Sequence, residues 1–305
     1  MTVQDSDTPP SSIAVRSGTA QAALGVAAFS LTFPATVWAL DGFGPWTTTG
    51  LRGLLAGLLA AVCLYAARVP PPAREHWPAL LTVAGGCAVG FPLLTTLALR
   101  TSSTAHSAVV IGVLPLATAI ASSALTGRRP PRAFWAAAGL GALTVAAFTV
   151  QQSGGLPTLG DAFLFGALLV CAAGYAQGGR LATRMPGWQV IAWGVVIALP
   201  VSALVTVVAL PVEPVAPNAR AVGGLLYIAA ISQFGGFVAW YRGMALIGVL
   251  RASQIQLTQP ILTLVWSALL MGETLSPLAP VAALLVLACV ATTQRTAAPQ
   301  RPAAT

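Results

Sequence analysis

Ten apolar runs, each about as long as a membrane-spanning helix, dominate this sequence. They lie at residues 20–40, 48–67, 77–99, 103–126, 133–151, 160–182, 187–210, 221–243, 251–272 and 278–294. A helix needs about 20 mostly apolar residues to cross a bilayer. The loops between the runs are short and rich in proline, glycine and arginine, so no soluble domain fits between them. The sequence predicts an all-α membrane protein with ten transmembrane helices.

The composition agrees with a chain that lies mostly in lipid. Charged residues make up 7% of the 305 residues, whereas a soluble domain carries about 25%. The formal net charge is +8, but the arginines are spread over short loops, which indicates topology determinants rather than a nucleic-acid site. Cys63, Cys87, Cys171 and Cys289 lie in apolar runs without a C-x-x-C pair. They are predicted to be core residues, and we expect no metal, cofactor or nucleic-acid partner.

The arginines also predict the orientation in the membrane. With the N-terminus inside, twelve of the 15 cationic residues fall on the inner side, and Arg52, Arg100 and Arg220 fall on the outer side. The positive-inside rule then places both termini in the cytoplasm of a multi-pass protein of the cell membrane. Residues 1–19 and 296–305 are predicted to be disordered cytoplasmic tails, because the first segment lacks the basic and apolar regions of a signal peptide.

A duplicated segment divides the ten helices into two sets of five. An offset of 145 residues aligns two stretches without a gap, matching Pro115, Thr118, Ser122, Leu125 and Gly127 to Pro260, Thr263, Ser267, Leu270 and Gly272. Five helices separate each position from its copy, and an odd number places the two copies in opposite orientations. We therefore predict two inverted five-helix repeats at 20–152 and 157–295. Inverted repeats are typical of transporters that bind substrate near the membrane midplane.

Short motifs within these two repeats resemble those of a known family. They are Trp240-Tyr-Arg-Gly-Met-Ala-Leu, then Ser253-Gln-Ile-Gln-Leu-Thr-Gln-Pro260, then Gly272-Glu273. A weaker first copy comprises Ala98-Leu-Arg, Ala105-His-Ser-Ala, Pro115 and Gly127, and Gly160-Asp161 opens the second half. Over about residues 20–295 the chain resembles the EamA-type transporters of the drug/metabolite transporter superfamily. It departs from them where arginine rather than glutamate follows Gly127.

The resemblance implies a function as well as a fold. It implies export of small metabolites, often amino acids or related compounds, by alternating access. Helices one, three, four, six, eight and nine would line the cavity, and helices five and ten would lie outside it. A multidrug or nucleobase exporter of the same fold and a non-transporting membrane scaffold are the alternatives. The protein is expected to act as a monomer or a homodimer.

Polar residues on the ninth run are the first candidates for substrate binding. Ser253, Gln256 and Pro260 follow at spacings of three and four and share one helix face, with Gln259 beside it. Their predicted role is a substrate-facing stripe, and helix–helix hydrogen bonding is the alternative. Pro115 is the copy of Pro260 in the first repeat, and either proline would free a backbone carbonyl.

Helices six and eight supply further candidates. Gln233 lies near the middle of its run beside two glycines, which favours either a substrate-binding amide or close helix packing. Trp240 and Tyr241 lie toward the inner end, where aromatic residues are interfacial anchors or form a cavity wall. Tyr175 and Gln177 are two positions apart and face nearly opposite sides of their helix. Tyr175 is the deeper cavity candidate, whereas Gln177 is also explained by solvation or a helix–helix bond.

Three charged or titratable residues, Arg242, His106 and Glu273, could carry a proton or bind a charge. Arg242 is predicted to extend to the inner interface or to pair with a substrate carboxylate. His106 is either a packed residue or a proton carrier. Glu273 is expected to be solvated or ion-paired at the outer end, and Asp161 to be an N-cap. Because every acid falls in a tail, a loop or a helix end, we expect neutral or zwitterionic substrates moving down their own gradient. No catalytic motif is present, so the sequence does not predict an enzyme.

Overall fold

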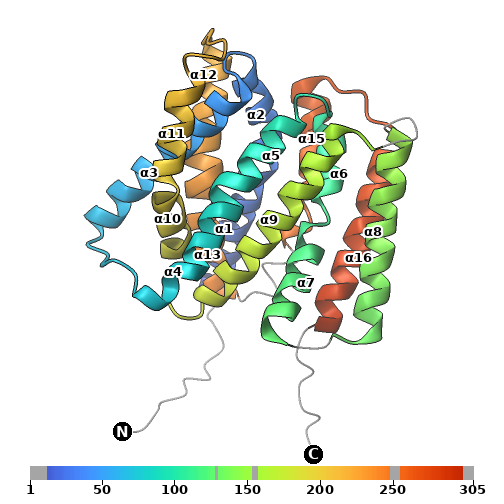
Figure 1. Cartoon of the computed structure of the whole chain (residues 1–305). Helices are drawn as coiled ribbons and strands as arrows, with labels where there is room; N and C mark the ends of the chain where they lie inside the picture. Colours follow the sequence, from blue (N-terminus) through green and yellow to red (C-terminus); the bar gives the residue numbers. More distant parts are fainter. Residues whose placement is uncertain (1–11, 128–129, 153–156, 248–254, 298–305) are drawn as a thin grey trace, which may run out of the picture.

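The computed structural model describes residues 12–127, 130–152, 157–247 and 255–297, and nearly all of them are helical. Figure 1 shows the helices as one bundle. The first half comprises α1 Ser12–Ser30, α2 Thr32–Leu40, α3 Pro45–Ala66, α4 Trp77–Val83, α5 Phe91–Ala98, α6 Thr104–Ile111, α7 Leu114–Thr126 and α8 Arg132–Gln152. The second half comprises α9 Leu159–Leu181, α10 Gly187–Ile197, α11 Leu199–Ala209, α12 Ala219–Leu226, α13 Gly236–Ile247, α15 Gln259–Met271 and α16 Leu278–Ala297.

These helices combine into membrane spans that follow the predicted runs. Among the described residues, seven segments are long and apolar enough to cross a membrane, and an eighth is formed if α10 and α11, bent by 41°, are one span. Two shorter apolar helices, Gln259–Met271 and Leu278–Thr292, lie at the ninth and tenth predicted runs. The prediction of an all-α, multi-pass membrane protein is confirmed.

The duplicated segment has the same backbone in both halves. Helices α7 and α15 each contain 13 residues, and each carries its proline at the second position. Both helices end at a glycine with φ of 66°, Gly127 and Gly272, a conformation that side chains with a Cβ rarely adopt. The turn at 112–113 before α7 recurs at 257–258 before α15. The repeat therefore includes a helix break placed just ahead of each proline.

A second shared irregularity interrupts the third and eighth predicted spans, residues 77–99 and 221–243. The residues Ala84–Gly90 in one and Tyr227–Gly235 in the other form π-helix, with wider hydrogen-bonded turns than α-helix. Both segments end at a glycine, and Gly90 and Gly235 are again 145 residues apart. π-Helical turns are frequent at functional sites because they displace the backbone locally.

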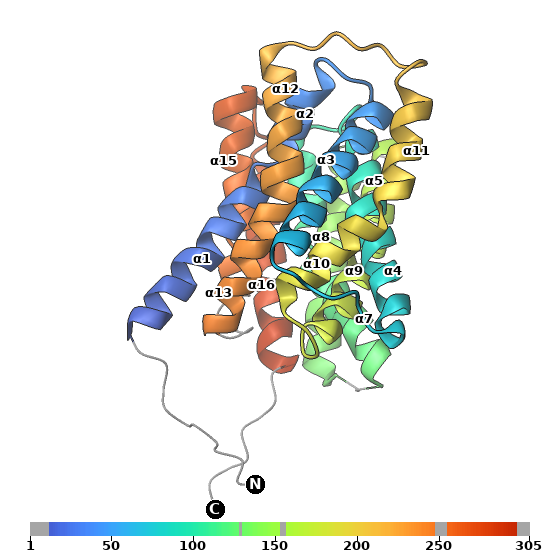
Figure 2. The same ribbon diagram turned by 90° about the vertical axis from the view of Figure 1, so that its left-hand side faces the viewer.

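The two halves pack against each other in matching pairs. Helix α1 packs along α13, and α5 packs along α9. The pairs α3 with α11 and α8 with α16 also join opposite halves. In Figure 1, α8 and α16 lie side by side at one edge of the bundle, and Figure 2 shows α1 crossing beside α13. Helices of both repeats therefore surround the interior, and α8 and α16 form one edge of the bundle.

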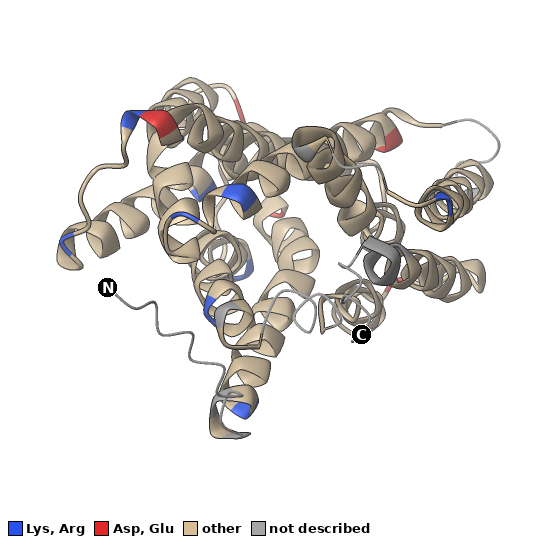
Figure 3. Cartoon of the chain, turned by 90° about the horizontal axis from the view of Figure 1, so that it is seen from below, with Lys and Arg blue, Asp and Glu red and all other residues tan. Residues whose placement is uncertain are grey.

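Charged residues are sparse on the helices, as Figure 3 shows from one end of the bundle. One of them corrects the sequence analysis. Arg52 was assigned to the outer side, because the second run was predicted to begin at residue 48. The helix begins earlier, at Pro45, so Arg52 lies two turns inside it and is only 3% exposed. Arg52 is a core residue and does not contribute to the arginine count outside the membrane.

Candidate functional site

A cavity of about 60 Å³ lies between the two halves of the bundle. Such a volume holds a few water molecules or a comparably small ligand group. The lining residues come from both repeats and are Phe29, Thr32, Phe33, Arg52, Cys87, Phe91, Ile111, Leu114, Cys171, Tyr175, Ser232, Gln233, Phe237, Gln256, Gln259 and Thr263. Aromatic walls with a few polar groups are typical of small-molecule sites.

A buried polar contact in the cavity joins Arg52 to Gln233. The Arg52 Nε donates a hydrogen bond to the Gln233 side-chain oxygen. The Gln233 amide nitrogen donates to the backbone carbonyl of Ala88 at 3.2 Å. Because the amide nitrogen is engaged with a carbonyl, its oxygen must face the guanidinium. The three residues form a chain of contacts from helix two through helix eight to the π-helical part of helix three.

Four of the residues predicted from the sequence line this cavity. They are Tyr175, Gln233, Gln256 and Gln259. Pro115 and Pro260 line a smaller adjoining cavity that shares Gln256 and Gln259. Ser253 lies outside the described residues. The repeated prolines and the glutamines therefore meet where the two broken helices face each other.

The other predicted residues lie away from the cavity lining. Trp240 is buried against α1, where a Cβ on Gly25 would be 3.0 Å from it, and it is not among the residues that line this cavity. Tyr241 stacks on Phe237 with ring centroids 6.2 Å apart. Gln177 is half-buried, and its side-chain oxygen has no hydrogen-bond partner among the described residues. Arg242 is exposed, as expected for a side chain that extends to the interface.

Sequence reasoning missed several lining residues besides Arg52. Thr32 and Ser232 are joined by a 2.8 Å hydrogen bond between helices one and eight. Thr263 donates to the backbone carbonyl of Ser30 at 2.9 Å, which ties helix nine to helix one. Phe237 meets Phe29 at a centroid distance of 4.8 Å and Tyr175 at 6.1 Å. Hydroxyls and phenylalanines are common in apolar helices, so the sequence offered no signal to separate these residues from ordinary core.

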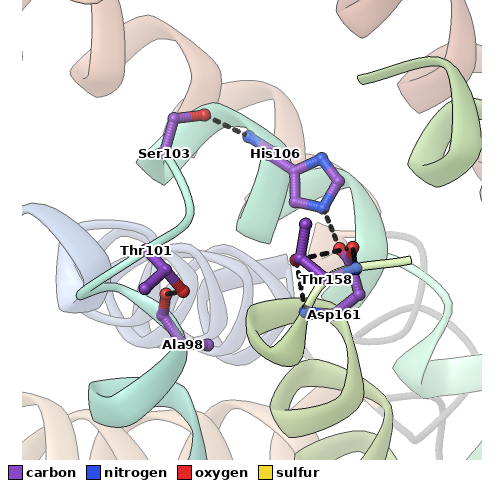
Figure 4. A network of polar contacts seen from close by, with 6 residues as sticks. All are labelled: Ala98, Thr101, Ser103, His106, Thr158 and Asp161. Atoms are coloured by element: carbon purple, nitrogen blue, oxygen red, sulfur yellow. Dashed lines mark hydrogen bonds and ion pairs between the residues drawn. The ribbon is translucent and has the colours of Figure 1, made fainter. Parts of the chain in front are cut away.

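A buried contact between a histidine and an aspartate lies at the end of the bundle predicted to face outward. The His106 Nε2 is 2.6 Å from the Asp161 Oδ1, and both side chains are buried (Figure 4). The His106 ring stacks on Phe148. The N-cap of α9 is Thr158, not Asp161, and the two residues form a capping box. The aspartate therefore caps its own helix through one oxygen and binds helix four through the other.

Two glutamates cap helices that belong to the other repeat. Glu273 accepts hydrogen bonds from the backbone N–H groups of Thr104 at 2.8 Å and Ala105 at 2.9 Å. Glu213 accepts from those of Trp46 at 3.2 Å and Thr47 at 2.7 Å. Sequence analysis expected Glu273 to be solvated or ion-paired. Instead its carboxylate satisfies free donors at the positive end of a helix dipole, as Glu213 does.

Comparison with known proteins identifies the family. The profile of the EamA-like transporter family matches residues 16–150 and again residues 158–293. The chain belongs to the EamA-like transporter family. The EamA frame thus occurs twice, in agreement with the two inverted repeats. The EamA assignment makes the chain a membrane transporter rather than an enzyme.

Two further comparisons describe the similarity of this chain to known proteins. The uncharacterized transporter YdeK of Bacillus subtilis (strain 168) is 39% identical over 272 residues, covering 89% of this chain and 95% of YdeK. A crystal structure of a protein with 22% sequence identity covers 91% of this chain and 98% of its own, with a TM-score of 0.59. At that identity the second comparison shows a shared EamA-like fold and nothing about substrate.

Proposed function

We propose that this EamA-family transporter exports small neutral or zwitterionic metabolites, amino acids or related compounds, by alternating access. The observation that carries the proposal is the cavity between the inverted repeats, because residues of both halves line it. Its polar groups are mainly amides and hydroxyls, which suit uncharged or internally neutral ligands.

The backbone offers a route to alternating access. The helix breaks at 112–113 and 257–258 and the two π-helical segments lie at equivalent positions of the repeats. Alternating access in inverted-repeat transporters proceeds by rocking one repeat against the other around a fixed site. Breaks that come in equivalent pairs would let either repeat move relative to the other.

The residues that line the cavity also distinguish between the alternative substrates. Arg52 is the charged residue of the lining, and a cationic drug would be repelled by it. A nucleobase is neutral and aromatic, so the phenylalanine walls suit it as an alternative substrate. A membrane scaffold would need no cavity shared between the two repeats.

A transport screen tests the proposal. The protein is reconstituted in liposomes that are loaded with neutral amino acids, nucleobases or cationic drugs. Counterflow of the labelled compound is then measured for each class. We expect counterflow with amino acids or related zwitterions. Flux of only cations or only nucleobases favours another exporter of this fold. If no class of compound is transported and the protein binds none of them, the result supports the alternative of a membrane scaffold.

A further inference from the structure

Arg52 carries a buried positive charge that no described residue neutralises. Within the described ranges no carboxylate lies within 4.0 Å of its guanidinium. The charged contacts found there join other residues. The five acids of those ranges are engaged elsewhere: Asp41 with Arg220, Glu75 with His76, Asp161 with His106, and Glu213 and Glu273 with helix N-termini.

The one hydrogen-bond partner that Arg52 has among the described residues does not balance its charge. Gln233 offers a neutral oxygen to Nε, and its amide nitrogen is held by Ala88. The Arg52 Nη1 is buried and has no hydrogen-bond partner in the described part of the chain. An unpaired charge away from water costs several kcal/mol, and the fork of N–H groups on a guanidinium matches a carboxylate. A carboxylate would supply both a neutralising charge and an acceptor for Nη1.

The helix that carries Arg52 is held in place from its other side. A Cβ on Gly53 would lie 2.3 Å from the Ser202 Oγ, and one on Gly50 would lie 2.6 Å from the Thr206 Oγ1. The glycines thus let α3 approach α11 closely, while Arg52 lines the cavity on a different face of the helix. A guanidinium fixed in this way is preorganised for a ligand.

We propose that Arg52 binds the carboxylate of the transported substrate, which makes the substrate a small carboxylate and, in its zwitterionic form, an apolar amino acid. The proposal rests on the proposed function and narrows its substrate class. The ammonium group of such an amino acid would contact the side-chain oxygens of Gln256 and Gln259. The rings of Tyr175 and Phe237 also line the cavity, and aromatic rings attract ammonium groups.

The experiment uses ligands that differ only in their charged ends. Purified full-length protein in detergent is heated with millimolar leucine, phenylalanine or valine, with the amide of each, and with 4-methylpentanoate. The same compounds then compete for counterflow in liposomes. We expect the amino acids and 4-methylpentanoate to raise the melting temperature and the amides to bind at least about tenfold more weakly, since they lack the charge-assisted contact.

Three variants assign the contact to Arg52. Arg52→Gln should reduce amino-acid binding about tenfold or more and abolish the preference over amides. Gln233→Glu supplies an internal carboxylate, so it should weaken carboxylate binding while the protein stays at least as stable. Arg100→Gln removes an exposed arginine at the end of helix three and is the matched control, with unchanged binding.

The outcomes separate this proposal from the proposed function. Equal binding of amino acids and amides overturns it, and so does a preference that survives in Arg52→Gln and Gln233→Glu. Failure of every carboxylate to stabilise the wild-type protein overturns it as well. If carboxylates bind through Arg52 but none is transported, the site stands and the export proposal fails. If amino acids are transported equally well by the wild-type protein and by Arg52→Gln, the export proposal stands and the site fails.

Discussion

The side chain of Gln233 donates a 3.2 Å hydrogen bond to the backbone carbonyl of Ala88, and the two residues are equivalent positions of the two repeats, 145 residues apart. Each lies in the π-helical segment of its own half. A contact between equivalent positions lies close to the axis that relates the repeats. The protein therefore has a polar contact at the centre of its internal symmetry, with an amide in one half and only a methyl group in the other.

Gln233→Leu and Gln256→Leu should separate structure from transport. Gln233 is 2% exposed and has two hydrogen-bond partners, so leucine leaves Arg52 and the Ala88 carbonyl unpaired. We expect the free energy of unfolding to fall by about 2 kcal/mol and transport to be lost. Gln256 is half-buried without a hydrogen-bond partner among the described residues, so its substitution should abolish transport and leave stability nearly unchanged. Chemical denaturation and counterflow measure the two effects, and equal stability losses would contradict this assignment.

Glu273→Ala and Glu213→Ala should each destabilise the protein. Each glutamate binds two backbone N–H groups at the start of a helix in the other repeat. Removing such a cap costs about 1 kcal/mol. Glu75→Ala is the control, because Glu75 is exposed and its partner His76 is 3.7 Å away. Thermal unfolding of the three variants checks the prediction, which fails if Glu75→Ala has the largest effect.

The two histidines should differ in their contribution to stability. His106→Leu leaves the buried Asp161 carboxylate without its imidazole partner, and losing a hydrogen bond to a charged group costs about 2 kcal/mol. His76→Leu alters a half-buried residue before α4 and should have a small effect. Denaturant unfolding of both variants gives the comparison. A stable His106→Leu protein would mean that the pair contributes little to the fold.

Counterflow should not need a pH gradient. The described residues that line the cavity include no acid and no histidine, so substrate binding has no titratable partner there near neutral pH. We expect robust counterflow at equal pH on both sides of the liposome membrane. Uptake against a gradient, driven by an imposed pH difference and retained in His106→Gln and Glu273→Gln, would refute this prediction.

Both termini should lie in the cytoplasm. The positive-inside rule carries this prediction, and it is sharper now that Arg52 is in the core, because the outer side keeps only Arg100 and Arg220 of the three arginines first assigned to it. A reporter that is active only outside the cytoplasm, fused after residue 305, should stay silent. Strong activity would reverse the orientation.

Local sequence was enough to predict the spans and the repeat. Hydropathy is a property of each single helix, and so is the position of its proline. The same local reading failed wherever a partner was distant. His106 meets Asp161 across 55 positions, and Glu273 caps Thr104 across 169. Arg52 was misplaced by one helical turn at the start of its span, which is the least certain part of any predicted helix. A lone arginine between Leu51 and Gly53 in an apolar run was the signal available.

The burial of Arg52 also determines the order in which the chain can be completed. Arg52 enters the membrane with the second span, whereas Gln233 is synthesised 181 residues later. An arginine within an inserting helix is disfavoured, by about 3 kcal/mol when it lies at the centre of the span. During synthesis the second span must therefore be retained beside the translocon or held by α11, whose contact with it needs only the seventh span. A nascent chain that stops before the eighth span lacks Gln233, so Arg52 is then without its side-chain partner.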